Sequence, residues 1–96
     1  MTELSILMPA YNEQRTIERA IERVLEADLG VDGIEVIVVE NGSTDATRAV
    51  LESRDWPQQV RILTVEENRG KGDGVRQALA VATGTYSAIL DADRNL

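Results

Sequence analysis

The sequence predicts an α/β protein with three layers (α/β/α), built on a Rossmann-like parallel sheet. Short apolar runs alternate with segments whose apolar residues recur every three or four positions, which gives the order βαβαβαβ. Such alternation requires parallel strands, right-handed crossovers and helices on both faces of the sheet. We predict four strands in the spatial order 3-2-1-4.

The composition excludes several kinds of site. The 96 residues include neither Cys nor His, which rules out disulfides, thiol nucleophiles, imidazole bases and the usual zinc ligands. A net charge of −7 argues against a nucleic-acid partner, because neutralising a phosphate backbone requires clustered Lys and Arg. No apolar run has the length of a membrane span, and the N-terminus does not resemble a secretory signal. We therefore expect a soluble, cytoplasmic chain.

The first predicted strand and helix occupy the first quarter of the chain. The apolar run Leu4–Met8 is closed by Pro9 and predicts a buried strand. Apolar residues then recur at the spacing of one helical face, namely Ile17, Ala20, Ile21, Val24 and Leu25. Asn12 is the predicted N-cap of this helix, because a short polar side chain can accept hydrogen bonds from the first free amides.

The second strand and helix follow the same rule. The run Ile34–Val39 is β-branched apart from Glu35, which favours a strand. It stops at the polar segment 40–45, in which Ser43 or Thr44 is expected to cap a second helix and Asp45 also to serve its start.

The third and fourth strands enclose a glycine-rich segment. The alternating run Val60–Val65 predicts a strand nearer the sheet edge, and Tyr86–Leu90 predicts the fourth strand. Between them, residues 66–74 contain three glycines. The helix that follows should stop before Gly84 and bury Val75, Ala78, Leu79 and Ala82.

Four unusual loops should meet at one edge of this sheet. They are residues 9–13, 40–45, 66–74 and 91–93, and each follows a predicted strand. The carboxyl ends of parallel strands share one edge, which is where open α/β sheets bind their ligands. Asp91 and Asp93 would bring two carboxylates there, and carboxylates with phosphates suit Mg²⁺. The sequence thus predicts a nucleotide site with a metal at its rim.

The motifs of the four loops together resemble glycosyltransferase family 2, the inverting enzymes of the GT-A fold. They are Pro9-Ala10-Tyr11-Asn12-Glu13, Val39-Glu40-Asn41-Gly42-Ser43-Thr44-Asp45, Asn68-Arg69-Gly70-Lys71-Gly72 and Leu90-Asp91-Ala92-Asp93. The third is most similar to the dolichyl- or polyprenyl-phosphate glucose and mannose synthases. The resemblance covers the whole chain. It implies that residues 1–96 form one nucleotide-sugar-binding subdomain, the N-terminal half of the fold, truncated just after the Asp-x-Asp motif.

The resemblance places the base and ribose of the donor against the first two loops. Pro9, Tyr11 and Glu13 would pack against them; Tyr11 offers an aromatic face, and Glu13 offers acceptors for ribose hydroxyls. Glu13 has a second interpretation as a first-turn acid of the helix. Where the family usually has Asp-Asp before Gly, this chain has Glu40 and Asn41. An amide has donors as well as an acceptor, so Asn41 should favour uracil over guanine unless the Glu40 carboxylate turns inward.

The third and fourth loops would hold the diphosphate and the sugar. By the resemblance, Arg69 and Lys71 lie near the diphosphate, although a flexible loop with a solvated basic pair is the alternative. Asp91 would contact the ribose or sugar, and Asp93 would bind the Mg²⁺ or Mn²⁺ that bridges the diphosphate. A calcium loop starting at Asp91 is disfavoured, because the sixth position is Leu96 where the turn needs Gly.

The implied function is transfer of a hexose from a UDP- or GDP-sugar to an acceptor, with a polyprenyl phosphate as one candidate. The resemblance puts the general base after the Asp-x-Asp motif, so no catalytic residue is assigned in this chain. We further expect a membrane-associated full-length enzyme and self-association of the chain. Two alternative functions remain. A fragment of a sugar nucleotidyltransferase would require a glycine-rich loop with Arg directly after the first strand, where this chain has Ala10-Tyr11-Asn12-Glu13. A flavodoxin-like signalling domain would need an Asp where Thr64-Val65-Glu66 stands.

Overall fold

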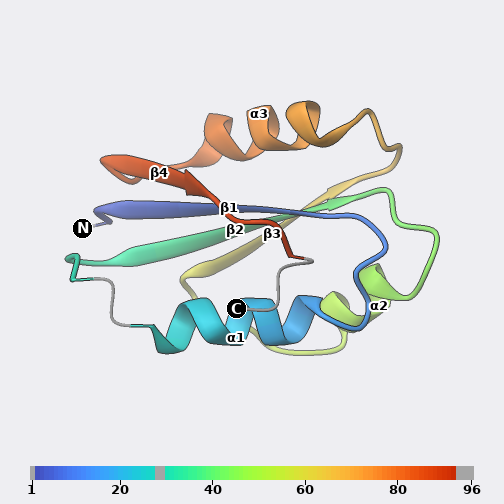
Figure 1. The fold of residues 1–96 in the computed structure, drawn as a ribbon, viewed down its shortest axis with the longest axis horizontal. Coiled ribbons are helices and arrows are strands. Elements are labelled where there is room, and N and C mark those ends of the chain that lie inside the picture. The colour runs from blue at the N-terminus through green and yellow to red at the C-terminus, as the bar shows by residue number, and fades with distance from the viewer. Residues whose placement is uncertain (1, 28–29, 93–96) are drawn as a thin grey trace.

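A parallel sheet forms the middle layer of the protein, with α1 and α2 on one face and α3 on the other (Figure 1). The computed structural model describes residues 2–27 and 30–92, and within them the sheet has four strands in the order β3-β2-β1-β4. The elements are β1 (Leu4–Ala10), α1 (Ile17–Glu26), β2 (Ile34–Asn41), α2 (Thr47–Glu52), β3 (Val60–Val65), α3 (Lys71–Val81) and β4 (Tyr86–Ile89). The predicted fold class and strand order are confirmed.

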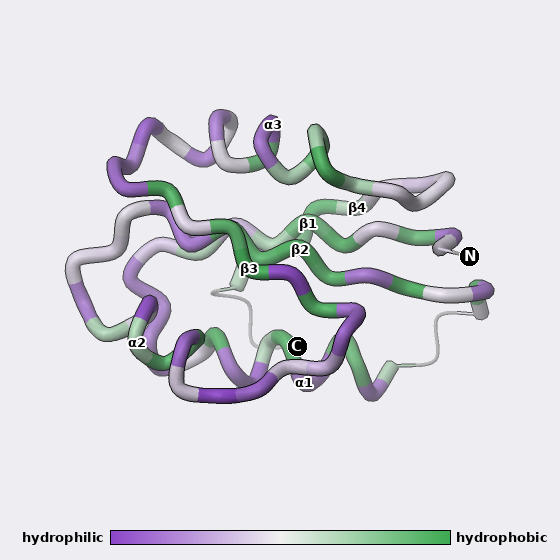
Figure 2. The backbone as a smooth tube through the Cα atoms, turned by 180° about the vertical axis from the view of Figure 1, so that it is seen from behind, coloured by the Kyte–Doolittle hydropathy of each residue, from purple (hydrophilic) through white to green (hydrophobic). Residues whose placement is uncertain are grey.

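The central strands β1 and β2 are buried on both faces, which explains their nearly continuous apolar sequence. One core cluster joins alternate residues of both strands, such as Met8 and Val38, to Ile17 and Ile21 of α1. The other joins Leu7, Ile37 and Val39 to Ala78 of α3. Figure 2 shows the hydrophobic colouring concentrated along these strands. Complete burial of one such side chain is worth about 1.5–3 kcal/mol, so the sheet is the rigid part of the molecule.

The predicted caps Asn12 of α1 and Ser43 or Thr44 of α2 are wrong, whereas the expected support of the second helix start by Asp45 is confirmed. Helix α1 begins at Ile17, five residues after Asn12, so Asn12 is too far from the helix to cap it. Its φ of +54° is left-handed. Helix α2 begins at Thr47, where Asp45 rather than Ser43 or Thr44 accepts the bond from the first helical amide. The loop side chains expected to cap their own helices make bonds to the neighbouring loop instead.

Helix α3 differs from its prediction at both its start and its buried face. It begins at Lys71, so Gly72 and Gly74 belong to the helix and not to a flexible loop. Gly74 and Ala78 form the buried stripe, whereas Leu79 is 50% exposed, against expectation. Small residues on this stripe let α3 lie close to β2, and the larger Leu79 is turned away from the sheet.

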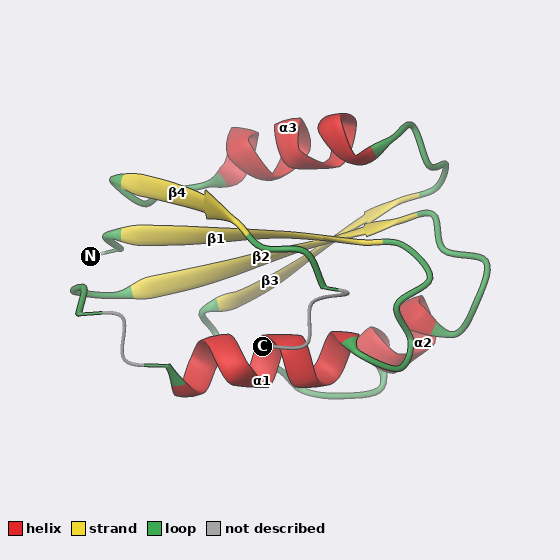
Figure 3. Ribbon diagram, in the orientation of Figure 1, coloured by secondary structure: helices red, strands yellow, loops and turns green. Residues whose placement is uncertain are grey.

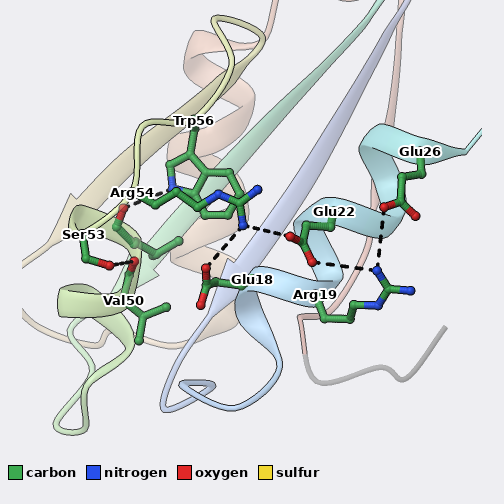
Figure 4. Close-up of polar contacts among 9 residues, drawn as sticks. Glu18, Arg19, Glu22, Glu26, Val50, Ser53, Arg54 and Trp56 are labelled. Atoms are coloured by element: carbon green, nitrogen blue, oxygen red, sulfur yellow. Dashed lines mark hydrogen bonds and ion pairs between the residues drawn. The ribbon is translucent and has the colours of Figure 1, made fainter.

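Arg54, in the segment that follows α2, connects that segment to α1. Its Nη1 lies 2.9 Å from Glu22 and 3.3 Å from Glu18 of α1, and its guanidinium stacks 4.2 Å from the Trp56 ring centroid (Figure 4). The Trp56 indole N–H donates to the carbonyl of Leu51 at 3.1 Å. These ion pairs are solvent-exposed, so they contribute little to stability. No helix in the described part of the chain is long and apolar enough to span a bilayer.

A buried carboxylate holds the amino edge of the sheet, opposite the predicted site. Glu35 Oε2 accepts hydrogen bonds from the Ser5 hydroxyl at 2.6 Å and from the amide and hydroxyl of Thr83 at 2.6 and 2.9 Å. Burial alone would raise the pKa of Glu35, but the bonds from Ser5 and Thr83, aided by Arg61, lower it below its ordinary value of 4.5. The charged form of Glu35 therefore stabilises the connection between α3 and β4.

We expect Glu35→Gln to lower the free energy of unfolding by about 1–3 kcal/mol at neutral pH, because charged hydrogen bonds are lost. The folded pKa is below 4.5, so the wild type has this stability above pH 4.5 and loses it as the pH falls through the folded value. The variant lacks that loss, and the two stabilities should converge in acid. Urea unfolding followed by circular dichroism, repeated from neutral pH to below pH 4.5, measures the free energy of unfolding of both proteins. The substitution Glu67→Gln at an exposed residue is the control. Parallel pH curves for Glu35→Gln and wild type would contradict the assignment.

Candidate functional site

An open cleft of about 370 Å³ lies at the carboxyl edge of the sheet. Figure 3 shows the loops after β1, β2 and β3 leaving the sheet on this side. Six of the eight predicted site residues line the cleft: Pro9, Tyr11, Glu13, Asn41, Lys71 and Asp91. Arg69 is exposed and is not among the lining residues, and Asp93 lies outside the described residues. The predicted meeting of four loops at one edge is thus confirmed.

One wall of the cleft is formed by the end of β1 and the residues that follow it. Pro9 lies inside β1, where its missing N–H breaks no ladder bond, because β4 pairs with β1 only as far as Leu7. Tyr11 follows and is 41% exposed on the cleft wall. The Glu13 amide donates to the Thr47 hydroxyl at 2.8 Å, which fixes the backbone of this wall to the start of α2.

Asn41 ends β2 at the base of the cleft and is only 2% exposed. Its Nδ2 donates to the carbonyl of Gly70 at 3.2 Å, and this bond fixes the orientation of the amide. Its Oδ1 is buried and has no hydrogen-bond partner within the described residues. A buried acceptor without a partner is uncommon, and an N–H of a bound ligand would satisfy it. The amide therefore has an acceptor available, as the carboxylate of the family pattern would.

Glu40 does not turn into the cleft. It is 1% exposed, and its Oε1 accepts a hydrogen bond from the Ser43 amide at 2.8 Å. Its carboxylate orders the loop after β2 and does not line the cleft. This arrangement does not support the alternative in which the Glu40 carboxylate turns inward and contacts the base.

Lys71 and Asp91 face each other across the cleft. The Lys71 Nζ lies 2.5 Å from Asp91 Oδ1, and the two side chains are 56% and 30% exposed. Lys71 is also the first residue of α3, which begins after Gly70 without a side-chain cap among the described residues. An ammonium group and an uncapped helix N-terminus both attract anions. This side of the cleft suits a phosphate.

Sequence reasoning missed Asn68, which also lines the cleft. Its Oδ1 accepts from the Gly70 amide at 2.7 Å and so shapes the turn before α3. The loop after β2 rests on the same residue: a Cβ on Gly42, whose φ is +71°, would lie 2.8 Å from the Asn68 backbone N. Gly42 in the second loop was the available signal, because a positive φ and a close approach to another backbone both favour Gly.

The described residues contain no group of three or more acidic side chains placed to hold a metal. They do place Glu13 and Asp91 on the same cleft. Mg²⁺ is usually held by one or two carboxylates together with phosphates of the ligand, so the donor chemistry of the cleft fits such an ion.

The sequence pattern is shared with known proteins. A family model described as glycosyl transferase family 2 matches residues 5–95. The chain is 37% identical over 100 residues to a dolichyl-phosphate beta-glucosyltransferase of Drosophila melanogaster, covering 95% of this chain and 31% of that protein. It is 38% identical over 91 residues to the succinoglycan biosynthesis protein ExoO of Rhizobium meliloti, covering 95% of this chain and 25% of that protein. The chain thus spans between 25% and 31% of the length of these two relatives.

The fold is shared with solved structures. A mannosyltransferase from Pyrobaculum calidifontis in complex with GDP-Man and Mn²⁺ has a TM-score of 0.81 and 32% identity, over 95% of this chain and 27% of that one. S. aureus TarS 1-349 in complex with UDP-GlcNAc has a TM-score of 0.82 and 27% identity, over 96% of this chain and 27% of that one.

We expect Gly42→Ala to lower the free energy of unfolding by about 1–3 kcal/mol, because it combines a left-handed φ with a contact against Asn68. Gly30→Ala is the matched control: Gly30 has a φ of +68° but nothing within 4 Å of its added Cβ. The difference between the two variants in urea unfolding isolates the contact between the second and third loops. Equal losses would show that backbone strain alone accounts for the effect.

Proposed function

The chain belongs to glycosyl transferase family 2, and we propose that it forms the donor-binding part of an enzyme that transfers a hexose from a nucleotide diphosphate sugar. The observation that carries this proposal is that six predicted donor-binding residues, from four separate loops, line one cleft. The ligands of two solved relatives, GDP-Man with Mn²⁺ and UDP-GlcNAc, support a donor of this class. The transfer itself and its acceptor belong to the proposal, because the chain spans less than a third of the two relatives.

Each side chain in the cleft is assigned the part of the donor that its chemistry suits. The Tyr11 ring offers a face to the base or ribose, and Glu13 offers acceptors to ribose hydroxyls. The free Oδ1 of Asn41 would accept from a base N–H. Lys71, with the first turn of α3, would bind the diphosphate, while Asp91 would contact the ribose or the sugar.

A divalent cation, Mg²⁺ or Mn²⁺, completes the proposed site. Asp93 follows Asp91 by two residues, and carboxylate oxygens are the ligands that these hard cations prefer. When bound, the cation supplies charge neutralisation for the leaving diphosphate. The Mn²⁺ in the Pyrobaculum calidifontis complex supports this part of the proposal.

We assign no general base within the described residues and place it in the region after the Asp-x-Asp motif. A polyprenyl phosphate is the proposed acceptor, supported by the identity to a dolichyl-phosphate beta-glucosyltransferase. Such an acceptor is already anionic and needs a weaker base than a neutral hydroxyl. A cytoplasmic location at a membrane face follows from that acceptor and is equally a proposal.

Self-association of the chain is proposed at the outer edge of β4. All four residues of the strand are exposed, and the run Tyr86–Leu90 carries no charge, so its unpaired backbone groups are open to a second copy. Analytical ultracentrifugation of the 96-residue chain would test it, and a strictly monomeric chain at high concentration would exclude it.

Calorimetric titration with UDP-glucose and GDP-mannose, with and without Mn²⁺, tests the proposed function. We expect Mn²⁺-dependent binding that Lys71→Met weakens about tenfold, since a charged hydrogen bond contributes roughly 1.5–3 kcal/mol. Arg76→Met is the control, because Arg76 is an exposed cation of the same helix that does not line the cleft. Binding of UTP but of neither sugar nucleotide would favour a nucleotidyltransferase. No binding of any nucleotide would overturn the proposed donor-binding function.

The base preference should depend on Asn41. Gly70 takes one of the two N–H groups of the Asn41 amide, and the one acceptor oxygen is left without a partner among the described residues. One acceptor satisfies the single N3–H of uracil but not the paired N1–H and N2–H donors of guanine. We expect UDP to bind more tightly than GDP, and Asn41→Asp to move the ratio about tenfold towards GDP, since an unpaired donor costs roughly 1–3 kcal/mol.

Asn68→Asp is the control for this experiment, because Asn68 lines the same cleft and the substitution adds the same charge. Its acceptor bond to Gly70 is preserved by the carboxylate. The assignment fails if GDP binds the wild type more tightly, or if the two Asp variants change the ratio equally.

A further inference from the structure

The β1–α1 loop (residues 11–16) and the β2–α2 loop (residues 42–46) are joined by hydrogen bonds that run in both directions. Three consecutive amides of the first loop donate to side chains beyond β2: Asn12 to Ser43 Oγ at 3.0 Å, Glu13 to Thr47 Oγ1 at 2.8 Å and Gln14 to Asp45 Oδ2 at 3.4 Å. Three consecutive amides of the second loop donate back: Thr44 and Asp45 to Asn12 Oδ1 at 2.8 and 3.2 Å, and Ala46 to Gln14 Oε1 at 2.8 Å. We call this set of bonds the loop clasp.

The clasp is made by side chains, because the backbones have no ladder at this level. The register of β1 and β2 ends at the pair Ala10 and Glu40. Beyond it, within the described residues, no backbone–backbone hydrogen bond joins the two loops. The relative position of the loops therefore depends on a few short polar side chains, which is a weaker and more adjustable connection than a sheet.

Asn12 is the centre of the clasp. Its Oδ1 accepts from the amide and the hydroxyl of Thr44, at 2.8 and 3.3 Å, and from the amide of Asp45, at 3.2 Å. Among the described residues it alone combines a side chain with a positive φ, of +54°. Asn adopts this left-handed conformation more readily than most residues, and its amide is short enough to reach the adjacent loop.

The neighbours of Asn12 are the two side chains of the first loop with proposed contacts to the nucleotide. Tyr11 precedes it and Glu13 follows it, and both line the cleft, whereas Asn12 does not. The second loop follows directly from Asn41 at the base of the cleft. We propose that Asn12 is a positioning residue, which through the loop clasp sets the Tyr11–Glu13 wall against Asn41 for nucleotide binding. This rests on the proposed function of the cleft.

The role of Asn12 in positioning can be separated from a role in stability. The clasp is largely solvent-exposed and lies outside both core clusters, so its loss should affect the global fold less than it affects the loop. Misplacement of binding groups by as little as ~1 Å can reduce function up to about 100-fold. The matched control is Ser5→Ala, which removes bonds to Glu35 and Gly84 at the opposite edge of the sheet.

The first measurement needs no nucleotide. The chain has two tyrosines, Tyr11 on the cleft and Tyr86 on β4, so incorporation of 3-fluorotyrosine gives one ¹⁹F NMR signal for each. Asn12→Ala and Asn12→Gly should shift or broaden the Tyr11 signal and leave that of Tyr86 unchanged. Asn12→Asp keeps an acceptor and tolerates the positive φ, so its Tyr11 signal should stay near that of the wild type. Ser5→Ala should leave the Tyr11 signal unchanged.

The second measurement is the affinity for UDP with Mn²⁺, compared with the midpoint of thermal unfolding. We expect Asn12→Ala and Asn12→Gly to weaken binding about tenfold or more, Asn12→Asp to weaken it far less, and Ser5→Ala to lower the midpoint without changing affinity. An unmoved Tyr11 signal in Asn12→Gly, or an affinity loss no larger than that of Ser5→Ala, would overturn the proposal. If the wild type binds no nucleotide, the proposed function fails, while the ¹⁹F signals still decide whether Asn12 positions Tyr11.

Discussion

The parallel pairing of β1 with β2 is the constraint on which the rest of the structure depends. The two strands run in register from Leu4 opposite Ile34 to Ala10 opposite Glu40, and both are covered on each face. Parallel strands force every connection to return across a face of the sheet, so each strand end comes out at the same edge. The cleft forms because the crossover connections bring all strand ends to this edge, and residues 30 or more positions apart in the sequence become neighbours in it.

The same pairing explains why the two edges of the sheet differ. At the amino edge, Glu35 is buried and accepts hydrogen bonds from Ser5 and Thr83, and it stabilises the fold. At the carboxyl edge, Asn41 retains an acceptor with no partner in the described residues, and the half-exposed Lys71 pairs with Asp91. One edge is closed by internal bonds, and the other retains polar groups for a ligand.

The strands could be predicted from the sequence because their burial requires apolar runs, and the location of the site followed from them. What could not be predicted is where loop side chains direct their hydrogen bonds. Asn12, Ser43 and Thr44 are the residue types that cap helices, and local sequence offers no sign that their partners lie on another loop. Leu79 was misplaced because the periodicity of α3 fits two faces, and close packing selected the one with Gly74 and Ala78. The roles of Arg69 and Asp93 stay predictions.

The position of Trp56 has a spectroscopic consequence. It is the one tryptophan of the chain, and it lies under Arg54 with its indole N–H bonded to Leu51, on the side of the molecule where α1 meets α2 (Figure 4). It is not among the residues that line the cleft. Its fluorescence should therefore follow the separation of α1 from α2 and remain insensitive to a ligand at the carboxyl edge. The protein thus contains an intrinsic optical probe of helix packing that is independent of its binding site.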